Sequence, residues 1–329
     1  MKNPFNPTKF EWEDNPQIWL SPLARSLTQN RKPAYISGTR GSGKTTVLRS
    51  LSSKLIMDSE FLRRQFSAKG FTWFGIYLQF NRNLQFYTSE LSDLINSSRN
   101  SNQPVIEEYE VFSKYFEISL LSSFLEELKL LELSGKIHTK AAGERQACQE
   151  LEAIFCNCKI PGIKAISDFS DARRLCEKIL DIFLARDYDY TPSFVRKIVS
   201  AFRTGRLIRF IKDFGISSLS SRYFKADRII DLYIMVDDCE SLTTDQQRAL
   251  NTYVRLMEGE AKWIVSYLSG QFNTTDTYLP NTSLTEADRD LRKLNDMTDS
   301  DFAIFCEKVA DIRLKNFITD NTEKRLSDP

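Results

Sequence analysis

A glycine-rich octapeptide near the start of the chain constrains its fold more than any other feature. Residues 38–45 read GTRGSGKT and match the phosphate-binding pattern G-x-x-x-x-G-K-[ST] in full. Glycine reaches backbone conformations that other residues resist, so several amides of such a loop can point at one anion. The candidate phosphate contacts in the loop and just after it are Gly38, Thr39, Arg40, Gly41, Ser42, Gly43, Lys44, Thr45 and Thr46.

The segments around this loop are the ones that the pattern requires. The apolar pair Tyr35 and Ile36 precedes the loop and is typical of a strand. A helix is predicted from Lys44 onward, because apolar side chains recur at helical spacing at Val47, Leu48, Leu51 and Leu55. In such a unit Lys44 would reach the β- and γ-phosphates of a nucleotide, and Thr45 would offer its hydroxyl to Mg²⁺.

A second apolar run, residues 229–236, ends in the acidic pair Asp237 and Asp238. In a chain with a phosphate loop, Asp237 is predicted to hold Mg²⁺ and Asp238 to orient the attacking water. Glu is usual in the second position, and Asp238 is one methylene shorter, so its reach to the water is reduced. Glu240 lies two residues further on and could substitute for it. Hydrolysis therefore depends on which of the two carboxylates reaches the water.

The rest of the chain surrounds these motifs with further strands and helices. Strands are predicted at residues 71–80 and 262–267, and helices at 116–131, 142–156, 169–185, 193–213 and 244–257. We expect the α/β class: a P-loop NTPase with one parallel sheet flanked by helices and interrupted by a large, mostly helical insertion. The expected parts are a first half of the core, the insertion, a second half of the core and a C-terminal helical segment, at residues 1–82, 83–225, 226–270 and 271–329.

Charge is balanced over the chain but uneven within the insertion. The 45 lysines and arginines nearly cancel the 44 aspartates and glutamates. Residues 104–135 nevertheless carry seven acids and two bases, and residues 186–228 carry ten bases and four acids. A basic patch for nucleic-acid phosphates is one interpretation. The bases of the helix predicted at 193–213 are spread around it, which favours the alternative that the two segments pack or solvate each other.

Other classes of site receive little support from the composition. His138 is the single histidine, which argues against His-rich metal sites and Ser-His-Asp catalysis. A zinc site could be imagined at Cys148, Cys156, Cys158 and Cys176, but buried thiols are the favoured interpretation. The first residues lack an apolar signal region, and no run of 18 apolar residues is present. We therefore expect a cytoplasmic protein without a membrane partner.

Together the motifs resemble the AAA+ ATPases of the ORC/Cdc6-like group, in particular the bacterial members linked to phage defence. The resemblance is carried by GTRGSGKTTVLRSLS, by FGIYLQF with Asn81 and Arg82 after it, by IMVDDCESL, and by DRDLRKL followed by DFAIFCEKVADIRL. Beyond the loop it covers about residues 50–85 and 226–317 and leaves out the helical middle. It implies an ATP- and Mg²⁺-dependent switch or assembly, as a homo-oligomer or with an effector protein, and with DNA as one further candidate partner.

The resemblance also implies roles for three residues outside the two motifs. Ser266, at the end of the third strand, matches the place of a polar sensor of the γ-phosphate, although an ordinary strand-end serine is the alternative. Arg289 and Arg292 could be arginine fingers or a sensor pair, or they could lie on a solvated helix face.

Two rival functions remain open at this point. An ABC-type ATPase would suit the long helical insertion, but it needs an LSGGQ-type loop before the acidic pair. Residues 217–221 lack the glycines, and the similar residues 268–271 come after that pair. A regulatory module that binds ATP without hydrolysing it is the second rival, and the short side chain of Asp238 supports it.

Overall fold

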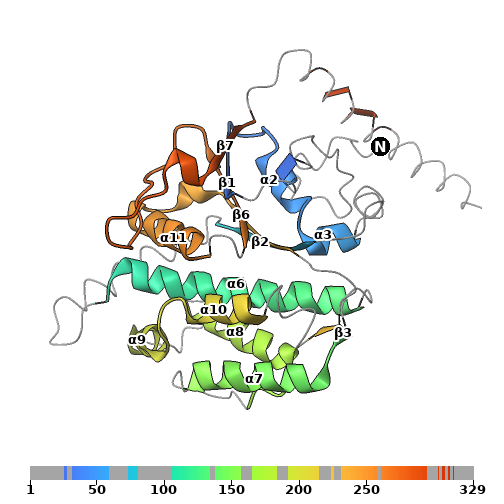
Figure 1. Ribbon diagram of the computed structural model, residues 1–329, viewed down its shortest axis with the longest axis vertical. Coiled ribbons are helices and arrows are strands. Elements are labelled where there is room, and N and C mark those ends of the chain that lie inside the picture. Colours follow the sequence, from blue (N-terminus) through green and yellow to red (C-terminus); the bar gives the residue numbers. More distant parts are fainter. Residues whose placement is uncertain are drawn as a thin grey trace, which may run out of the picture.

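The core of the protein is one parallel sheet of five strands (Figure 1). The computed structural model describes residues 26–27, 32–58, 73–80, 106–133, 138–156, 165–183, 192–214, 224–225, 231–257, 261–294 and a few positions between 303 and 314. The strands lie in the order β2–β5–β6–β1–β7. Their bounds are Ala34–Gly38 (β1), Trp73–Gln79 (β2), Asp231–Asp237 (β5), Lys262–Leu268 (β6) and Asp290–Lys293 (β7).

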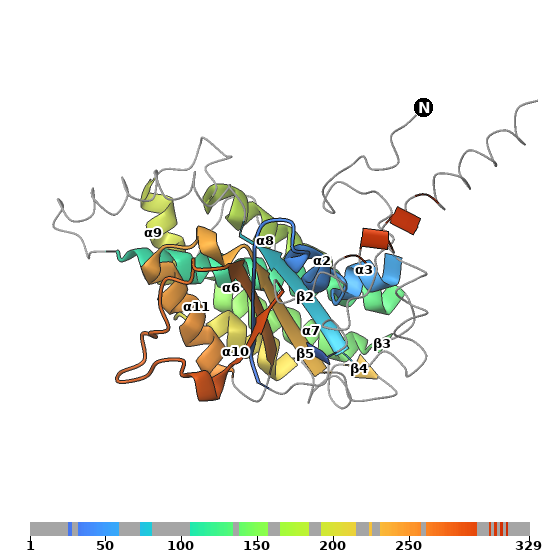
Figure 2. The ribbon, with the colours of Figure 1, turned by 90° about the horizontal axis from the view of Figure 1, so that it is seen from above.

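Helices cover both faces of this sheet, as a buried parallel sheet requires. Alternate strand residues point to opposite faces, so each face has its own apolar cluster. Helices α2 (Lys44–Arg49) and α3 (Ser53–Asp58) pack on one face. Helices α6 (Glu108–Leu133) and α11 (Thr244–Leu256) pack on the other. Seen from above, α6 runs behind the strands (Figure 2).

The helical middle of the chain is joined to the sheet through α6. The remaining helices of this layer are α7 (Ala141–Phe155), α8 (Phe169–Phe183), α9 (Pro192–Ala201) and α10 (Arg206–Phe214). Aromatic rings of α6 contact the strands directly, with 5.2 Å between the ring centres of Phe124 and Phe74. One continuous apolar cluster therefore extends from the sheet through α6 to α7, α8 and α10. A small antiparallel pair, β3 (His138–Thr139) and β4 (Phe224–Lys225), lies beside this layer.

A buried acid on α6 links it to α10 and α11. Glu117 is fully buried and accepts hydrogen bonds from the amides of Gly205 and Leu207, the second at 2.9 Å. It also accepts the Tyr253 hydroxyl at 2.8 Å. Burial raises the pKa of Glu117, against the effect of these donors and of Lys114. The acidic and basic segments do pack together here, but through backbone amides rather than through paired charges.

The helix predicted after the loop is broken in the structure. Helix α2 ends at Arg49 and α3 begins at Ser53, because the residues between them bind strand β2. The Leu51 carbonyl accepts the Trp73 indole N–H at 3.0 Å, and the Ser53 hydroxyl accepts the Gly75 amide at 2.9 Å. A Cβ at Gly75 would lie 2.1 Å from the Leu51 oxygen, so only glycine allows this approach. The prediction of one continuous helix was wrong.

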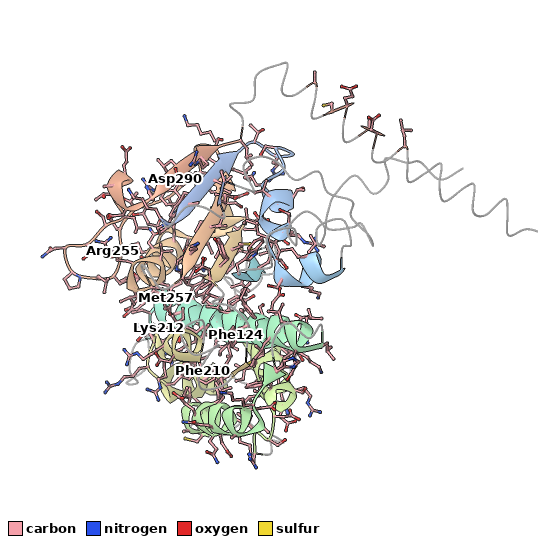
Figure 3. The ribbon with its side chains drawn as sticks, turned by 45° about the vertical axis from the view of Figure 1, so that its right-hand side comes forward. Phe124, Phe210, Lys212, Arg255, Met257 and Asp290 are labelled. Atoms are coloured by element: carbon pink, nitrogen blue, oxygen red, sulfur yellow. The ribbon has the colours of Figure 1, made fainter. Side chains whose placement is uncertain are left out.

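The helix predicted at 193–213 is also two helices, α9 and α10. They are separated by a turn in which Gly205 has a φ of +85°. In α10 Arg206, Arg209 and Lys212 are exposed at three-residue spacing, and the buried apolar side chains are Leu207, Ile208, Phe210 and Ile211. Figure 3 shows Phe210 inside the helical layer and Lys212 at its surface. The bases of α10 therefore share one face, and the prediction that they are spread around the helix was wrong for this element.

The segment EADRDLRKL forms a strand rather than a helix. A short 3₁₀ turn, η4 (Glu286–Asp288), leads into β7, which pairs with the outer edge of β1. The Asp290 amide bonds to the Pro33 carbonyl and the Leu294 amide to the Ser37 carbonyl, both at 2.8 Å. Pairing with an open strand edge overrides the weak strand propensity of these residues. The alternative of a solvated helix face for Arg289 and Arg292 was wrong.

The other predicted strands and helices are present within one to three residues of their expected bounds, apart from α6, which begins eight residues earlier and ends two later. Residues 217–221, Asn81 and Arg82 lie outside the described residues, as does most of the chain after residue 294. None of the helices in the described ranges combines the length and the apolar character that crossing a membrane would require.

Candidate nucleotide site

The two predicted motifs lie at the same edge of the sheet. The phosphate loop follows β1, and Asp237 ends β5, because the carboxyl ends of parallel strands share one edge. Strand β6 lies between them and pairs with both. With about 4.8 Å between neighbouring strands, β1 and β5 are about 10 Å apart. The structure thus brings the predicted phosphate and metal groups to one side of the molecule.

The phosphate loop depends on its glycines. Gly41 and Gly43 have φ values of +80° and +89°, in the left-handed region that favours glycine. A Cβ at Gly38 would lie 2.3 Å from the Ser42 hydroxyl. The loop is closed by a hydrogen bond of 3.3 Å from the Ser42 amide to the Thr39 carbonyl. Its tight bend is therefore available only to a sequence with glycine at these positions.

Lys44 is folded back over this loop. Its side chain is buried, and its ammonium group donates to the carbonyls of Gly38 at 3.0 Å and Thr39 at 3.1 Å. A lysine has three donors, and a phosphate oxygen is a stronger acceptor than a neutral carbonyl. A bound phosphate can therefore draw the ammonium group away from the loop. Thr45 and Thr46 are half-buried in the first turn of α2.

Asp237 is fully buried and held by three donors. The Tyr77 hydroxyl donates to Oδ2 at 2.9 Å. The Ser266 hydroxyl and the Asp238 amide donate to Oδ1, the amide at 3.1 Å. Burial and the neighbouring Asp237 carboxylate raise the pKa of Tyr77, so Tyr77 stays a phenol that donates its proton. Ser266, the predicted sensor, thus bonds directly to the predicted metal ligand.

Asp238 has an unusual backbone conformation. Its φ of 58° lies in the left-handed region, which is uncommon for a residue other than glycine and is often found at functional sites. Its carboxylate accepts a hydrogen bond of 2.7 Å from the side-chain amide of Gln79. Asp238 is the N-cap residue of the 3₁₀ turn η3 (Cys239–Ser241).

Strand β2 contributes two site residues that the sequence reasoning missed. Tyr77 and Gln79 are two residues apart, so they lie on the same face of β2 and reach Asp237 and Asp238 respectively. The signal was present, since both lie in the run FGIYLQF that carries part of the resemblance. A polar side chain at every second position of an apolar strand marks one face for a separate role.

The other predicted residues lie elsewhere. Glu240 points back at the sheet, where it accepts the Leu268 amide at 3.2 Å. Arg289 lies near the amino end of β1, over the rings of Tyr35 and Phe272. Arg292 lies on β7 and bonds to Asp290 at 2.8 Å. The structure does not bring either arginine to the acidic pair of its own chain.

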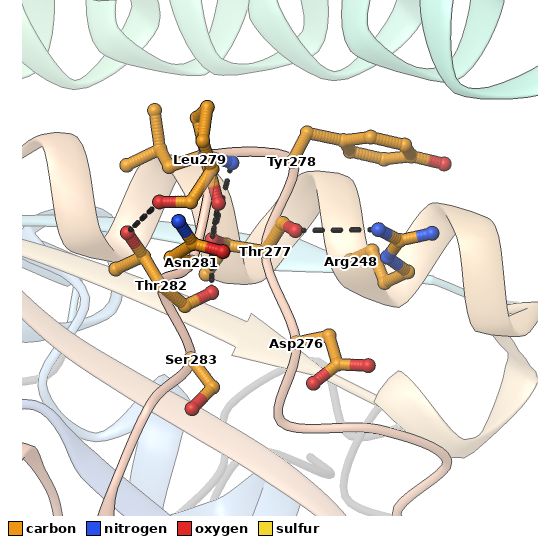
Figure 4. A pocket seen from close by; sticks show the side chains of 9 residues that line it. Arg248, Asp276, Thr277, Tyr278, Leu279, Asn281, Thr282 and Ser283 are labelled. Atoms are coloured by element: carbon orange, nitrogen blue, oxygen red, sulfur yellow. Dashed lines mark hydrogen bonds between the residues drawn. The ribbon is translucent and has the colours of Figure 1, made fainter.

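Cavities among the described residues include two that bear on the site. The larger, about 380 Å³, lies between Arg248 of α11 and the loop at residues 276–283, and none of the predicted site residues lines it (Figure 4). The smaller, about 300 Å³, is lined by Arg49 of α2, by Tyr77 and Gln79, and by Glu127 of α6, among others. It therefore adjoins the two side chains that hold the acidic pair.

The donor set suits a magnesium nucleotide. Mg²⁺ prefers oxygen ligands and is commonly held by one or two protein groups together with substrate phosphates. The Thr45 hydroxyl and the Asp237 carboxylate are such groups, beside a loop built for phosphate. The cysteines imagined as a zinc site do not gather here: Cys148 and Cys176 are buried in the helical layer, Cys156 is exposed, and Cys158 lies outside the described residues.

A family model described as ORC-CDC6-like matches residues 3–328. The match includes the helical middle, so the expectation that the resemblance leaves this region out was wrong. No curated protein and no solved structure matches the chain.

Proposed function

The chain belongs to the ORC-CDC6-like family, and on that premise we propose that it is a Mg²⁺-dependent AAA+ ATPase that works as a nucleotide-driven switch. The observation that carries this proposal is the position of the loop at residues 38–45 and of Asp237 and Asp238 at one sheet edge, one strand apart. The family supports this function over the ABC-type alternative.

Each group at this edge has a role that its chemistry suits. The loop amides and Lys44 would bind the phosphates, and Thr45 and Asp237 would hold Mg²⁺. The bound metal would neutralise charge on the phosphates. Asp238 would orient the attacking water, and positioning and electrostatic stabilisation would account for most of the rate.

The contact between Gln79 and Asp238 regulates this last step in our proposal. It occupies one oxygen of the carboxylate that must orient the water. Hydrolysis then requires Asp238 to turn away from Gln79, while nucleotide binding does not. Glu240 is a weaker candidate for the same task, because its carboxylate already accepts the Leu268 amide.

A path from the loop to the helical layer supports the switch. The linker between α2 and α3 reaches α6, where the Ser52 hydroxyl donates to Glu127 at 3.2 Å. Lys54 of α3 also pairs with Glu126 at 3.0 Å. A shift of α2 on nucleotide binding would therefore be passed to α6, through which we propose that a second copy or an effector protein senses the nucleotide. A role in phage defence rests on the resemblance alone, whereas DNA binding rests on the resemblance and on the basic residues at 186–228.

Turnover and binding of ATP test this function together. We expect Lys44→Ala to weaken nucleotide binding by about 100-fold, since it removes a charge-assisted contact. Asp238→Ala should abolish turnover with binding intact, and Gln79→Ala should raise turnover a few-fold. All variants are measured with and without DNA.

Two outcomes would contradict parts of the proposal. A wild-type rate no higher than that of Lys44→Ala would leave the second candidate, a module that binds ATP without hydrolysing it. That candidate is favoured by the engaged state of Asp238. Unchanged affinity in Lys44→Ala would exclude both functions.

A further inference from the structure

Side chains and backbone of the described residues already occupy most of the acceptor positions of the predicted metal ligand, Asp237. Tyr77 donates to Oδ2 of Asp237 at 2.9 Å, and Ser266 and the Asp238 amide donate to Oδ1. A carboxylate has about four acceptor positions, so these three donors fill most of them. Because Asp237 is fully buried, a cation or its water can reach it only where a donor moves.

Of the three donors, Tyr77 has the most room to move. Ser266 is fully buried and has a short side chain, and the Asp238 amide is part of the backbone. Tyr77 is half-buried and lines the smaller cavity, about 300 Å³ in volume, beside Gln79. Rotation of its ring into this space would release Oδ2 and leave the donors on Oδ1 in place.

Tyr77 is also linked to the phosphate loop. The Arg49 guanidinium lies 5.8 Å from the centre of its ring, within the range of a cation–π contact. Arg49 ends α2, the helix that begins with Lys44. A shift of α2 when the loop closes on phosphates is therefore passed to the ring of Tyr77.

We infer that Tyr77 is a positioning residue that competes with the divalent cation for Oδ2 of Asp237 and so sets the Mg²⁺ concentration at which the nucleotide site fills. The inference rests on the proposed function. Tyr77 makes no contact with nucleotide in this role and acts through Asp237. Its hydroxyl keeps the buried carboxylate hydrogen-bonded while no cation is bound.

The competition predicts a gain of metal affinity on removal of one hydroxyl. Tyr77→Phe keeps the ring and its packing but leaves Oδ2 without this donor. The Mg²⁺ concentration for half-maximal binding of an ATP analogue should fall by about tenfold or more, the worth of one hydrogen bond to a charged group. A residue with a merely structural role would raise that concentration or leave it unchanged.

The test is a Mg²⁺ titration of the full chain with a fluorescent, slowly hydrolysed ATP analogue. A parallel titration follows Mn²⁺ binding by electron paramagnetic resonance. The matched control is Tyr233→Phe, on the same strand as Asp237, whose hydroxyl contacts Lys262 at 2.9 Å and not the acidic pair. Tyr77→Phe is also made in an Asp237→Asn background, where we expect it to have no effect. Thermal unfolding without metal confirms that each variant is folded.

The results separate this inference from the function on which it rests. Tighter Mg²⁺ and Mn²⁺ binding in Tyr77→Phe alone, lost in the Asp237→Asn background, supports the inference. An unchanged or weaker metal requirement, or the same gain in Tyr233→Phe, overturns it and leaves the ATPase proposal standing. Wild-type binding that does not depend on Mg²⁺ overturns both.

Discussion

Two buried carboxylates, Asp237 at the sheet edge and Glu117 on α6, accept similar numbers of hydrogen bonds, but the donors differ in kind and we expect different roles for the two residues. Each is fully buried, and each accepts three hydrogen bonds, one of them from a tyrosine. The donors to Glu117 include the backbone amides of Gly205, just before α10, and of Leu207, in its first turn. Two of the three donors to Asp237 are hydroxyl groups, and one of these borders a cavity.

Burial and the number of donors therefore do not distinguish the predicted metal ligand from a carboxylate that links helices. A backbone amide can only donate, whereas a hydroxyl can donate or accept and can rotate away. The backbone donors therefore hold Glu117 in one geometry, which suits a structural link between helices. Asp237 can exchange a partner, which suits a ligand that must accommodate a cation.

The largest effect should come from Glu117→Gln. The NH₂ group of the glutamine would face the amide of Gly205 or Leu207. Both groups can only donate, so two buried donors would be left without an acceptor. We expect the free energy of unfolding to fall by about 3 kcal/mol. Urea unfolding measures this loss. A loss below about 1 kcal/mol would contradict this view, because Glu117 would then tolerate the substitution as readily as Asp237.

Asp237→Asn is the matched change at the sheet edge. Its amide can donate to the Tyr77 oxygen, while its carbonyl keeps the Ser266 and Asp238 donors, so we expect a stability loss of no more than about 1 kcal/mol. The Mg²⁺ concentration for half-maximal nucleotide binding should rise by about 100-fold, since a charged ligand is lost. If urea unfolding shows that the variant is as unstable as Glu117→Gln, the distinction between the two sites fails.

Glu127 is a third buried carboxylate, and it is expected to make the stability of the protein depend on pH. It accepts the Ser52 hydroxyl at 3.2 Å, while its Oε2 is buried without a partner among the described residues. Burial raises the pKa of Glu127 to about 8, above its value in the unfolded chain, so the folded state keeps a proton that the unfolded state has lost. Its contribution to stability therefore falls as the pH rises from about 4.5 to 8.

Glu127→Gln should remove that part of the pH dependence. Relative to wild type, we expect the variant to gain about 1 to 2 kcal/mol between pH 5 and pH 8, after allowance for water reaching the cavity. Urea unfolding of both proteins at the two pH values measures the difference, and the contribution of Glu117 cancels in it. Parallel pH curves for the two proteins would show that Glu127 is ionised throughout.

The sequence predicted the parts of the site that depend on short motifs. The loop at residues 38–45 is recognisable because its chemistry demands glycine, lysine and threonine at set positions. The acidic pair after an apolar strand is recognisable for a similar reason. Ser266 was found only through its place at the end of the third strand, and its contact with Asp237 was not foreseen.

The features that the sequence did not predict have a common physical cause, which is pairing between segments far apart in the chain. The edge strand β7 was missed because its pairing with β1 gives no signal in the charged residues DLRK. The break between α2 and α3 was missed because it exists to bind Trp73 and Gly75 of β2. Glu117 gave no sign of its role, since its partners follow it by 88 and 90 residues.

The class of fold and the loop suited to phosphate could therefore be predicted from the residues alone, because glycine conformation and strand and helix periodicity act over a few neighbouring positions. The side chains that contact the acidic pair, and the distance of Arg289 and Arg292 from it, follow from the arrangement of the strands. Tyr77 and Gln79 reach Asp237 and Asp238 because β2 lies beside β5 in the sheet, about 160 residues away in the chain. Hydrogen bonds that cross such a separation depend on strand order, and no local pattern of residues encodes it.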